Sequence, residues 1–311
     1  MKKIIVVGAG GVGGFFGAKM SKAGYDLGFI ARGPHKKAIE KHGLKIKSID
    51  GDFIARPWVT DQYASLSEAD LIVLAVKSWQ LDELAKEMAP YLHQRAVILP
   101  LQNGADNTER LQRSLPGHRV LGGLCKIVSK IESPGIIDHF AYVPEIVYGS
   151  DDPNLKNELD ELSEIFEKSG IKHLKSSSIQ RHIWLKFLFI ASISGLGALT
   201  RAVLGIMRDT PFLREKIRET AREIIALGQA KGVALDENDL KKTMKIIDAN
   251  MYGTTMSMQR DIMEGRPSEL ENFNGFIVKE SKRLGVPSPV NEWIYECLLP
   301  MEQAARKAKG L

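Results

Sequence analysis

The chain begins with a short apolar segment that runs directly into a glycine-rich stretch. Residues 4–7 are apolar and β-branched, as is typical of a buried strand, and the next six are Gly8, Ala9, Gly10, Gly11, Val12 and Gly13. A Gly-x-Gly-x-x-Gly pattern between a strand and a helix is the fingerprint of dinucleotide binding. Its glycines allow a tight turn, close approach of the backbone to a diphosphate, and close packing of helix on strand. We therefore expect residues 8–13 to bind a dinucleotide through the free N–H groups at the start of the helix.

The end of the next expected strand indicates which dinucleotide is bound. This strand covers residues 25–31, and Arg32 follows it. Chains that bind NAD carry an Asp or Glu near this point, which accepts hydrogen bonds from the ribose hydroxyls. Here no carboxylate occurs before Glu40, whereas the Arg32 guanidinium can bind a 2′-phosphate through paired charge-assisted hydrogen bonds. The sequence therefore favours NADP over NAD.

Length and composition indicate a soluble protein with two cores. The chain has 311 residues, of which 44% are hydrophobic and 26% are charged. The net charge of +5 is a mild basic bias without the basic runs of a nucleic-acid surface. The apolar stretch of residues 183–200 contains Lys186 with several serines and glycines, so we expect a core helix there and no membrane span. We expect a cytoplasmic protein without a nucleic-acid or membrane partner.

Metal binding is not expected either. The two cysteines, Cys125 and Cys297, lie far apart, and the seven histidines form no pair with ligand spacing. The number of copies in the native assembly stays open, because the apolar helices near the C-terminus suit a homodimer interface and a monomer core equally well. The expected partner is therefore a small molecule, with the dinucleotide as the cofactor.

The order of the expected elements predicts the fold class. Strand-like segments at residues 71–76 and 96–101 alternate with helical patterns, which predicts a parallel, doubly wound sheet with right-handed crossovers. A strand-rich patch at residues 136–148, a helix and a last strand at residues 171–174 follow. Almost everything beyond this strand has helical periodicity. We therefore expect an α/β protein with a Rossmann-type domain over residues 1–177 and an all-helical domain over residues 178–311.

Two polar residues at strand ends are candidates for binding. Lys77 follows the strand at residues 71–76, and Asn103 follows the strand at residues 96–101. In open α/β sheets, ligands bind outside the carboxyl ends of the strands. We therefore expect Lys77 and Asn103 near the nicotinamide ribose and the substrate. A cleft between the two domains is the expected place for the active site.

The helical half offers a candidate proton donor and three further residues. A lysine in a helix as apolar as that of Lys186 either extends to solvent or points into a polar cleft. In a cleft, desolvation lowers its pKa from the usual value of about 10.4 and makes it a better proton donor near neutral pH. Ser194 lies eight residues further on, on the same helix face. Ser257 and Glu269 are the remaining candidates, although Ser268 can cap the next helix and place Glu269 in its first turn.

Taken together, these motifs resemble the ketopantoate reductase (2-dehydropantoate 2-reductase) family over nearly the whole chain. The family joins a Rossmann-type domain to a helical domain and reduces a 2-keto acid with NADPH. The motifs that carry the resemblance, in the order of the family, are Gly8-x-Gly10-x-x-Gly13, Arg32, Val76-Lys77, Gln102-Asn103-Gly104, Trp184-x-Lys186, Ser257 through Glu269, Asn274-Gly275 and Gly285-Val286-Pro287.

The resemblance implies which candidate residues contact the cofactor. Arg32 would contact the 2′-phosphate of the cofactor. Lys77 and Asn103 would contact cofactor and substrate. Glu269 would help to hold the cofactor and the polar network around the ketone, and we count it with the catalytic residues.

The resemblance also assigns the reacting groups, and one part of the pattern is missing. Lys186 would donate the proton to the ketone, and Ser257 would bind the substrate carboxylate. Family members typically carry substrate-binding asparagines where this chain has Ile190 and Ser194, and a further polar position is Leu204 here. Each substrate group left unpaired costs roughly 1–3 kcal/mol. We keep Ser194 as a substrate contact, and a less hydroxylated or bulkier keto acid becomes an alternative substrate.

The resulting hypothesis is NADPH-dependent reduction of 2-dehydropantoate to pantoate in the synthesis of pantothenate, the precursor of coenzyme A. Hydride would come from NADPH and the proton from Lys186. One alternative is a reductase of a different 2-keto acid or an aldehyde on the same scaffold. Another is a protein without catalytic activity that senses NADP, which would bind the cofactor and turn over no keto acid.

Overall fold

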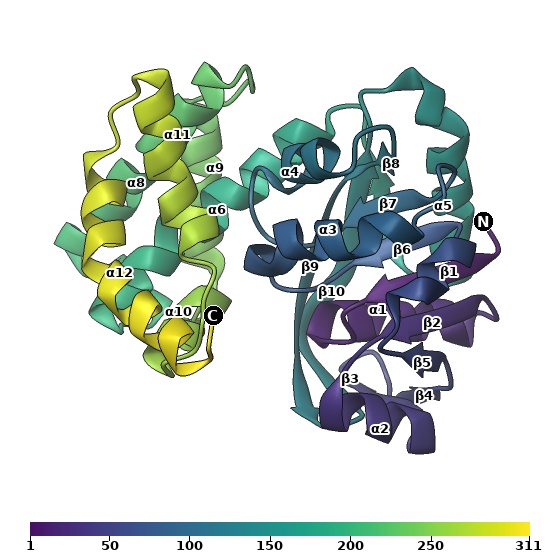
Figure 1. The fold of residues 1–311 in the computed structure, drawn as a ribbon. Coiled ribbons are helices and arrows are strands. Elements are labelled where there is room, and N and C mark those ends of the chain that lie inside the picture. The colour runs from purple at the N-terminus through teal and green to yellow at the C-terminus, as the bar shows by residue number, and fades with distance from the viewer. The chain divides into compact units, whose positions relative to one another are not determined.

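The structure is a computed structural model that describes residues 1–311. The chain divides into two compact units, Met1–Ile179 and Gln180–Leu311, which we call the N-terminal unit and the C-terminal unit. The first contains all the strands, whereas the second is built of helices (Figure 1). The sequence analysis places the division after residue 177, in the short segment that precedes α6 (Ile179–Thr200).

A six-stranded parallel sheet forms the centre of the N-terminal unit. Its strand order is β5-β2-β1-β6-β7-β8, so the chain adds strands first on one side of β1 and then on the other. This is the doubly wound arrangement that the sequence predicts, and the fold class is confirmed. The strands are β1 (Lys3–Val7), β2 (Asp26–Ile30), β5 (Trp58–Thr60), β6 (Leu71–Leu74), β7 (Val97–Pro100) and β8 (Arg119–Val120).

Helices cover both faces of this sheet because its strands are apolar on both faces. Successive side chains of a strand point to opposite faces. Ile4 and Val6 of β1 therefore pack in one hydrophobic cluster with α1 and α5, and Ile5 and Val7 pack in another with α3 and α4. The helices of this unit are α1 (Gly11–Lys22), α2 (Gly33–His42), α3 (Leu81–Met88), α4 (Asn107–Ser114) and α5 (Lys156–Lys168).

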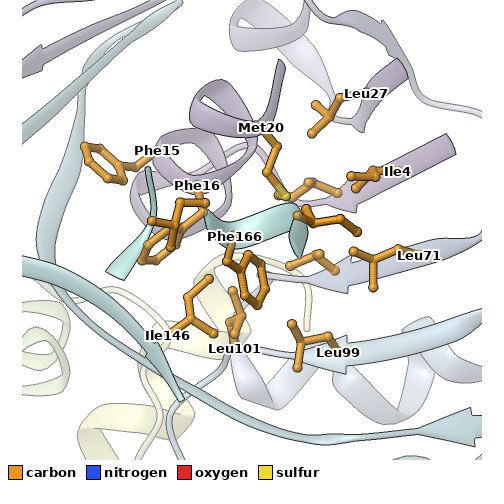
Figure 2. Close-up of a cluster of buried hydrophobic side chains, with 14 of the residues drawn as sticks. Ile4, Phe15, Phe16, Met20, Leu27, Leu71, Leu99, Leu101, Ile146 and Phe166 are labelled. Atoms are coloured by element: carbon orange, nitrogen blue, oxygen red, sulfur yellow. The ribbon is translucent and has the colours of Figure 1, made fainter. Parts of the chain in front are cut away.

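Large aromatic side chains fill the first of these clusters. Figure 2 shows Phe15 and Phe16 of α1 and Phe166 of α5 around the strand residues of the sheet. All three are buried, with at most 1% of their surface exposed. Burial of a side chain of this size contributes about 1.5–3 kcal/mol. These contacts fix α1, and therefore the glycine-rich segment at its start, against the sheet.

A second, five-stranded sheet extends the N-terminal unit beyond what the sequence analysis anticipated. Its order is β11-β10-β3-β4, and β9 pairs with β10 in antiparallel orientation. Only the strand-rich patch at residues 136–148 and the strand at residues 171–174 were expected. The second half of β9 is largely exposed. Its apolar residues are interrupted by lysine, serine and glutamate, so the sequence shows no continuous hydrophobic run there. The strands are β3 (Leu44–Ser48), β4 (Phe53–Ala55), β9 (Gly122–Ser133), β10 (Ile136–Gly149) and β11 (Lys172–Lys175).

The C-terminal unit contains no strand, as the sequence predicts. A short π-helical segment, η5, interrupts the regular helices and leads directly into α11. Single π-turns of this kind are frequent at functional sites. Its elements are α6 (Ile179–Thr200), α7 (Leu204–Asp209), α8 (Pro211–Ala230), α9 (Glu237–Ala249), α10 (Ser257–Met263), η5 (Glu271–Gly275), α11 (Phe276–Leu284) and α12 (Pro289–Ala308).

The long apolar helix α6 is the one helix whose length and composition would suit a membrane span, and 72% of its most apolar window is buried inside the protein. Its aromatic residues pack on the helices around it. Phe187 makes edge-on contacts with Phe273 and Phe276, with ring centroids 5.9 and 5.8 Å apart, and Trp184 is 1% exposed. We interpret α6 as the core helix of this unit.

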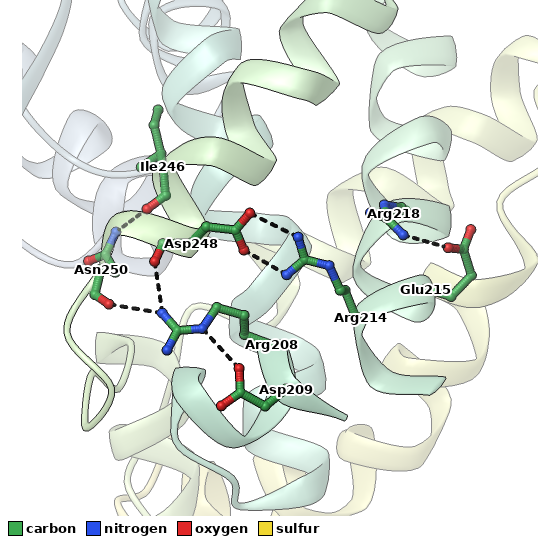
Figure 3. Close-up of polar contacts among 8 residues, drawn as sticks. All are labelled: Arg208, Asp209, Arg214, Glu215, Arg218, Ile246, Asp248 and Asn250. Carbon is green, nitrogen blue, oxygen red and sulfur yellow. Dashed lines mark hydrogen bonds and ion pairs between the residues drawn. The ribbon is translucent and has the colours of Figure 1, made fainter. Parts of the chain in front are cut away.

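A charged cluster connects the ends of α7, α8 and α9 (Figure 3). Arg214 pairs with Asp248 through two hydrogen bonds of 2.6 and 2.8 Å, and this pair lowers the pKa of Asp248. Arg208 donates to the backbone carbonyls of Asp248 and Asn250 at 2.9 and 3.1 Å. Since the last carbonyls of a helix lack partners within it, Arg208 satisfies the end of α9. The cluster thereby anchors the segment that leads to Ser257.

Candidate active site

The glycine-rich segment has the geometry that dinucleotide binding requires. Gly8 has φ +99°, a conformation that side chains disfavour. A Cβ on Gly13 would lie 2.0 Å from the Gly8 carbonyl oxygen, so only glycine lets α1 pack this closely on β1. A Cβ on Gly10, in contrast, would meet no atom within 4 Å. The backbone therefore faces open space at Gly10, where a diphosphate can approach it.

The N-terminus of α1 is suited to an anion. Gly10 is its N-cap, no side chain caps it, and its first turn contains no acidic residue. The first N–H groups of a helix have no acceptor within the helix, and the helix dipole adds positive potential there. Together with the open space at Gly10, these groups fit the diphosphate of a nicotinamide dinucleotide.

The loops that carry the other candidates of the N-terminal unit leave the sheet at the same edge. The last residues of the central strands are register partners in parallel pairs: Val7 with Ile30, Val7 with Leu74, and Leu74 with Pro100. The segments that follow them contain the glycine motif, Arg32, Lys77 and Asn103. The structure therefore brings these segments to one edge of the sheet, as expected for a binding site in an open α/β fold.

Arg32 is held loosely at the start of α2. Its Nη2 donates to the Tyr63 hydroxyl at 3.2 Å, and the guanidinium lies 5.8 Å from the centre of that ring. Burial raises the pKa of Tyr63, so the hydroxyl stays protonated. The pairing of Arg32 with Glu87 is long, at 3.9 Å, and the Arg32 side chain is 69% exposed. Exposed pairs of this kind contribute little, so an incoming phosphate can compete for the guanidinium.

The structure corrects the position of Lys77 slightly. The expected strand at residues 71–76 ends at Leu74, so Lys77 lies beyond the strand end and precedes the short helix Ser78–Gln80. Its backbone N–H donates to the Gln80 side chain at 3.3 Å. At the next strand, the Asn103 carbonyl accepts a hydrogen bond of 3.0 Å from the Asn107 side chain. Both backbone positions are thus fixed by a side chain of the following helical segment.

Two polar residues near Asn103 carry features that the sequence does not reveal, although Gln102 belongs to the motif Gln102-Asn103-Gly104. Gln102 is 7% exposed, and neither polar atom of its side chain has a hydrogen-bond partner. Asp106 also has a buried oxygen without a partner, and burial raises its pKa to about 6. Buried polar atoms nearly always have partners, so this loop offers groups that a polar ligand can satisfy. The only signal in the sequence was a run of polar residues directly after a buried strand.

On α6, one of the predicted substrate contacts is used within the helix. Lys186, Ile190 and Ser194 follow one another at intervals of four residues and therefore lie on one face of the helix. The Ser194 hydroxyl donates to the Ile190 carbonyl oxygen at 2.5 Å, and Ser194 is 1% exposed. Leu204, at the first position of α7, is likewise 1% exposed. Where the resemblance leads us to expect polar substrate contacts, the chain therefore has the buried apolar side chains of Ile190 and Leu204 and a serine whose hydroxyl is already hydrogen-bonded within the helix.

Ser257 is the first residue of α10, and a glutamine fixes this end of the helix. Gln259 is fully buried. Its Oε1 accepts from the Met256 N–H at 3.2 Å, and its Nε2 donates to the Ala202 carbonyl at 2.9 Å. The start of α10 is thereby tied to the segment between α6 and α7, which sets the position of Ser257 within the unit.

Glu269 lies in the turn before η5 and is 4% exposed. Ser268 precedes it, and its hydroxyl accepts a hydrogen bond of 3.1 Å from the Leu270 N–H. The N-cap of η5 is Leu270, with no side-chain cap, so the alternative in which Ser268 caps the helix and Glu269 lies in its first turn is wrong. The buried Glu302 carboxylate accepts from the Ser268 N–H at 3.0 Å and from its hydroxyl at 2.5 Å. Helix α12 thus holds the turn that carries Glu269.

The C-terminal unit therefore presents its candidates on three elements: Lys186 and Ser194 on α6, Ser257 on α10, and Glu269 before η5. No group of three or more His, Cys, Asp and Glu side chains is arranged to hold a metal ion. The doubly wound sheet with its glycine motif, followed by a helical unit with a lysine in its core helix, defines a nicotinamide-dinucleotide-dependent oxidoreductase.

The chain belongs to the ketopantoate reductase family. Residues 4–152 match the model described as "Ketopantoate reductase PanE/ApbA", and residues 178–302 match "Ketopantoate reductase PanE/ApbA C terminal". The matches cover both units, so each of them, and not the dinucleotide-binding unit alone, belongs to the family. The protein is accordingly an oxidoreductase of the 2-dehydropantoate 2-reductase type.

Known relatives are similar over almost their full length. The "Uncharacterized oxidoreductase YkpB" of Bacillus subtilis is 30% identical, with 94% of this chain and 96% of the relative covered. A "2-dehydropantoate 2-reductase" of Nostoc sp. is 27% identical, with 96% and 94% covered. Among solved structures, a PanE/ApbA family ketopantoate reductase from Ralstonia eutropha JMP134 has a TM-score of 0.89 at 27% identity, with 98% and 99% covered.

Proposed function

We propose that this protein reduces 2-dehydropantoate to pantoate with NADPH, in the cytoplasmic synthesis of pantothenate. The observation that carries the proposal is the glycine-rich segment, whose geometry suits the diphosphate of a dinucleotide, on a chain whose resemblance to the family implies that Lys186 is the proton donor. The name of the Nostoc relative supports the choice of substrate. The proposed partner is the small keto acid, and a homodimer is compatible with the proposal but not required by it.

The preference for NADPH rests on the end of β2. Arg32 occupies the N-cap of α2, and its exposed guanidinium is suited to paired hydrogen bonds with a 2′-phosphate. The segment between Arg32 and Glu40 contains no carboxylate that would accept hydrogen bonds from the ribose of NADH. We therefore propose that Arg32 discriminates between the two dinucleotides and that Lys77, Asn103 and Glu269 complete the cofactor contacts.

The bound dinucleotide supplies a hydride to the carbonyl carbon of the keto acid. In this proposal the Lys186 ammonium stabilises the negative charge that develops on the carbonyl oxygen and then donates a proton to it. Ser257 binds the substrate carboxylate, and Asn103 orients the keto acid. Glu269 holds the polar groups around the ketone, and its buried turn gives it a fixed position.

A second candidate substrate is a 2-keto acid with a less polar side chain. Ile190 provides no hydrogen bond, and the Ser194 hydroxyl is already bonded to the Ile190 carbonyl. A site lined in this way gives the 4-hydroxyl of ketopantoate fewer partners, and each unpaired group costs roughly 1–3 kcal/mol. A keto acid without this hydroxyl, such as 2-oxoisovalerate, avoids the cost.

A steady-state panel tests the proposal. Oxidation of NADPH is followed with ketopantoate, 2-oxoisovalerate, pyruvate and 2-oxoisocaproate, and NADH serves as the cofactor control. We expect the highest kcat/KM for ketopantoate with NADPH. A higher value for 2-oxoisovalerate would support the second candidate and move the enzyme out of pantothenate synthesis. No oxidation with any keto acid, while NADPH still binds, would contradict both and support a cofactor sensor.

A further inference from the structure

A histidine on α2 joins the glycine-rich segment to the second sheet. The His35 Nδ1 accepts a hydrogen bond of 3.0 Å from the Gly135 N–H, in the turn between β9 and β10. Its Nε2 lies 2.8 Å from the Ala9 carbonyl oxygen. Because Nδ1 accepts, it carries no proton, and Nε2 must be the protonated nitrogen that donates to Ala9. The two contacts therefore define a neutral imidazole with one fixed tautomer.

The contact with Ala9 controls the direction of a backbone N–H in the cradle. Ala9 lies between Gly8 and Gly10 and is 4% exposed. The peptide unit is planar and trans, so its carbonyl and the next N–H point in opposite directions. When His35 binds the Ala9 carbonyl, the Gly10 N–H is turned away from His35. Gly10 is the N-cap of α1, and it is the glycine beside which a Cβ would meet no atom.

The contact with Gly135 gives His35 a firm support. The Gly135 carbonyl accepts from the Lys45 N–H of β3 at 2.9 Å, so the turn is itself part of the second sheet. The imidazole is partly buried between these two segments. The second sheet, which the sequence predicts only in part, is thus connected to the glycine-rich segment through the His35 side chain.

We propose that His35 is a positioning residue for the dinucleotide: its neutral imidazole clamps the Ala9 carbonyl and thereby orients the Gly10 N–H toward the diphosphate. The inference rests on the proposed binding of NADPH and adds a residue outside the Gly-x-Gly-x-x-Gly motif to that site. His35 touches no reacting atom, so its effect falls on cofactor affinity and not on the chemical step.

The clamp depends on the charge of the imidazole. Burial lowers the pKa of His35, and the hydrogen bond to the Ala9 carbonyl opposes this shift without reversing it. The charged groups on the elements that His35 joins are Arg32, Lys36, which pairs with Glu40 and Asp61, and Lys47, which pairs with Glu132. A protonated imidazole has N–H groups on both nitrogens, so Nδ1–H would face the Gly135 N–H. Since the folded pKa lies below the ordinary value, the clamp is complete at neutral pH and is lost as the pH falls through the folded pKa.

Two substitutions separate the two contacts. In His35→Asn, the amide oxygen takes the place of Nδ1 and keeps the Gly135 contact, whereas the contact to Ala9 is lost. In His35→Gln, the amide nitrogen takes the place of Nε2 and keeps the Ala9 contact. His42→Gln, at the exposed end of the same helix, is the matched control.

The experiment is a fluorescence titration of NADPH binding, with hydrogen exchange of the free proteins as a second readout. We expect His35→Asn to weaken NADPH binding about tenfold, with kcat at saturating NADPH nearly unchanged and with faster exchange at residues 8–14. His35→Gln should retain most of the affinity. Between pH 7.5 and 5.5 the wild type should lose more affinity than His35→Gln. The 2′-phosphate of NADPH titrates in the same range, but its effect cancels in this comparison.

Equal affinities and equal exchange in the wild type and His35→Asn would overturn the inference. A larger loss in His35→Gln than in His35→Asn would overturn it as well, since the Ala9 contact would then not be the important one. If the wild type binds no NADPH, the proposed function fails. The exchange at residues 8–14 still decides whether His35 positions the segment.

Discussion

In the N-terminal unit the candidate residues lie on loops just beyond the ends of parallel strands, whereas in the C-terminal unit they lie on helices and on a buried turn. The loops are positioned by the register of the sheet, which brings Gly8, Arg32, Lys77 and Asn103 to one edge. The helical candidates depend instead on individual side-chain contacts, such as those of Gln259 with Met256 and Ala202.

Because of this difference, the two units tolerate different kinds of substitution. Backbone geometry at the glycine-rich segment leaves little freedom, because a Cβ on Gly13 would collide with the Gly8 carbonyl. On α6, in contrast, a side chain can change without moving the helix, and the resemblance to the family implies that Ile190 and Ser194 are such changes. We therefore expect the cofactor site to be the constant part of the enzyme and the helix face beyond Lys186 to set the substrate.

The largest expected effect comes from removing the proposed proton donor. Lys186→Ala should lower kcat by about 10³-fold, because both the proton donor and the positive charge at the ketone are lost. NADPH binding should persist, since the dinucleotide cradle lies in the other unit. Lys241→Ala, at an exposed position of α9, is the control for loss of a lysine. A kcat within about tenfold of the wild type would remove Lys186 from the mechanism.

The next largest effect concerns the choice of cofactor. Arg32→Ala should raise the KM for NADPH by about 10²-fold, which corresponds to roughly 2.7 kcal/mol for a charged pair. The KM for NADH should change little, because NADH has no 2′-phosphate. Lys37→Ala, an exposed lysine of α2, should leave both values unchanged. Equal losses for both dinucleotides would mean that Arg32 supports the fold of the site and does not read the phosphate.

A pair of glycine substitutions distinguishes the open side of the cradle from its packed side. Gly10→Ala should leave Tm unchanged and raise the KM for NADPH about tenfold, because the new Cβ points into open space. Gly13→Ala should lower Tm by several degrees, since its Cβ would collide with the Gly8 carbonyl. Thermal unfolding and steady-state kinetics of both variants check this. The reverse pattern would contradict the assignment of the open side to the diphosphate.

A smaller effect should follow from restoring an amide on α6. Ile190→Asn should raise the ratio of kcat/KM for ketopantoate to that for 2-oxoisovalerate about fivefold, because the hydroxyl of ketopantoate gains a partner worth roughly 1 kcal/mol. Ile190→Leu, which keeps the apolar surface, is the control. An unchanged ratio in Ile190→Asn would show that this helix position does not contact the substrate side chain.

The smallest effect is a pH-dependent change in stability beside Asn103. Burial raises the pKa of Asp106 to about 6, so the folded protein binds this proton more tightly than the unfolded chain does. Stability from this group is present at low pH and is lost as the pH rises toward 6 and above. Asp106→Asn should therefore raise Tm by about 3 °C at pH 7.5 and have little effect at pH 4. Asp151→Asn, at an exposed position, should show no such difference.

The first sheet could be predicted from the sequence because its strands are apolar on both faces and its turns require glycine. Residues 71–76 and 96–101 were recognisable as strands for this reason, and they placed Lys77 and Asn103 at the correct sheet edge. In the second sheet, β10 and β11 agree with the strands expected at residues 136–148 and 171–174. Strand β9 was missed because half of it is exposed and shows no hydrophobic run. It becomes evident only from its pairing with β10.

The candidate site divides in the same way. Arg32 and Lys186 could be proposed from the sequence because a local pattern surrounds each of them, and their roles stay predictions. The unpartnered amide of Gln102, a residue of the motif Gln102-Asn103-Gly104, and the bridging imidazole of His35 could not be predicted, since they depend on partners that are absent or distant in sequence. The internal hydrogen bond of Ser194 is a further case, because helical spacing gives the face of a residue and not the partner of its hydroxyl.

The most direct test of the central claim is the transfer of a label from cofactor to product. NADPH that carries deuterium at the reactive C4 position is incubated with ketopantoate and the wild-type enzyme, and the pantoate is analysed by mass spectrometry. Direct hydride transfer to the carbonyl carbon predicts pantoate with one deuterium at C2. Unlabelled pantoate, or no pantoate while NADPH remains bound, would contradict the account.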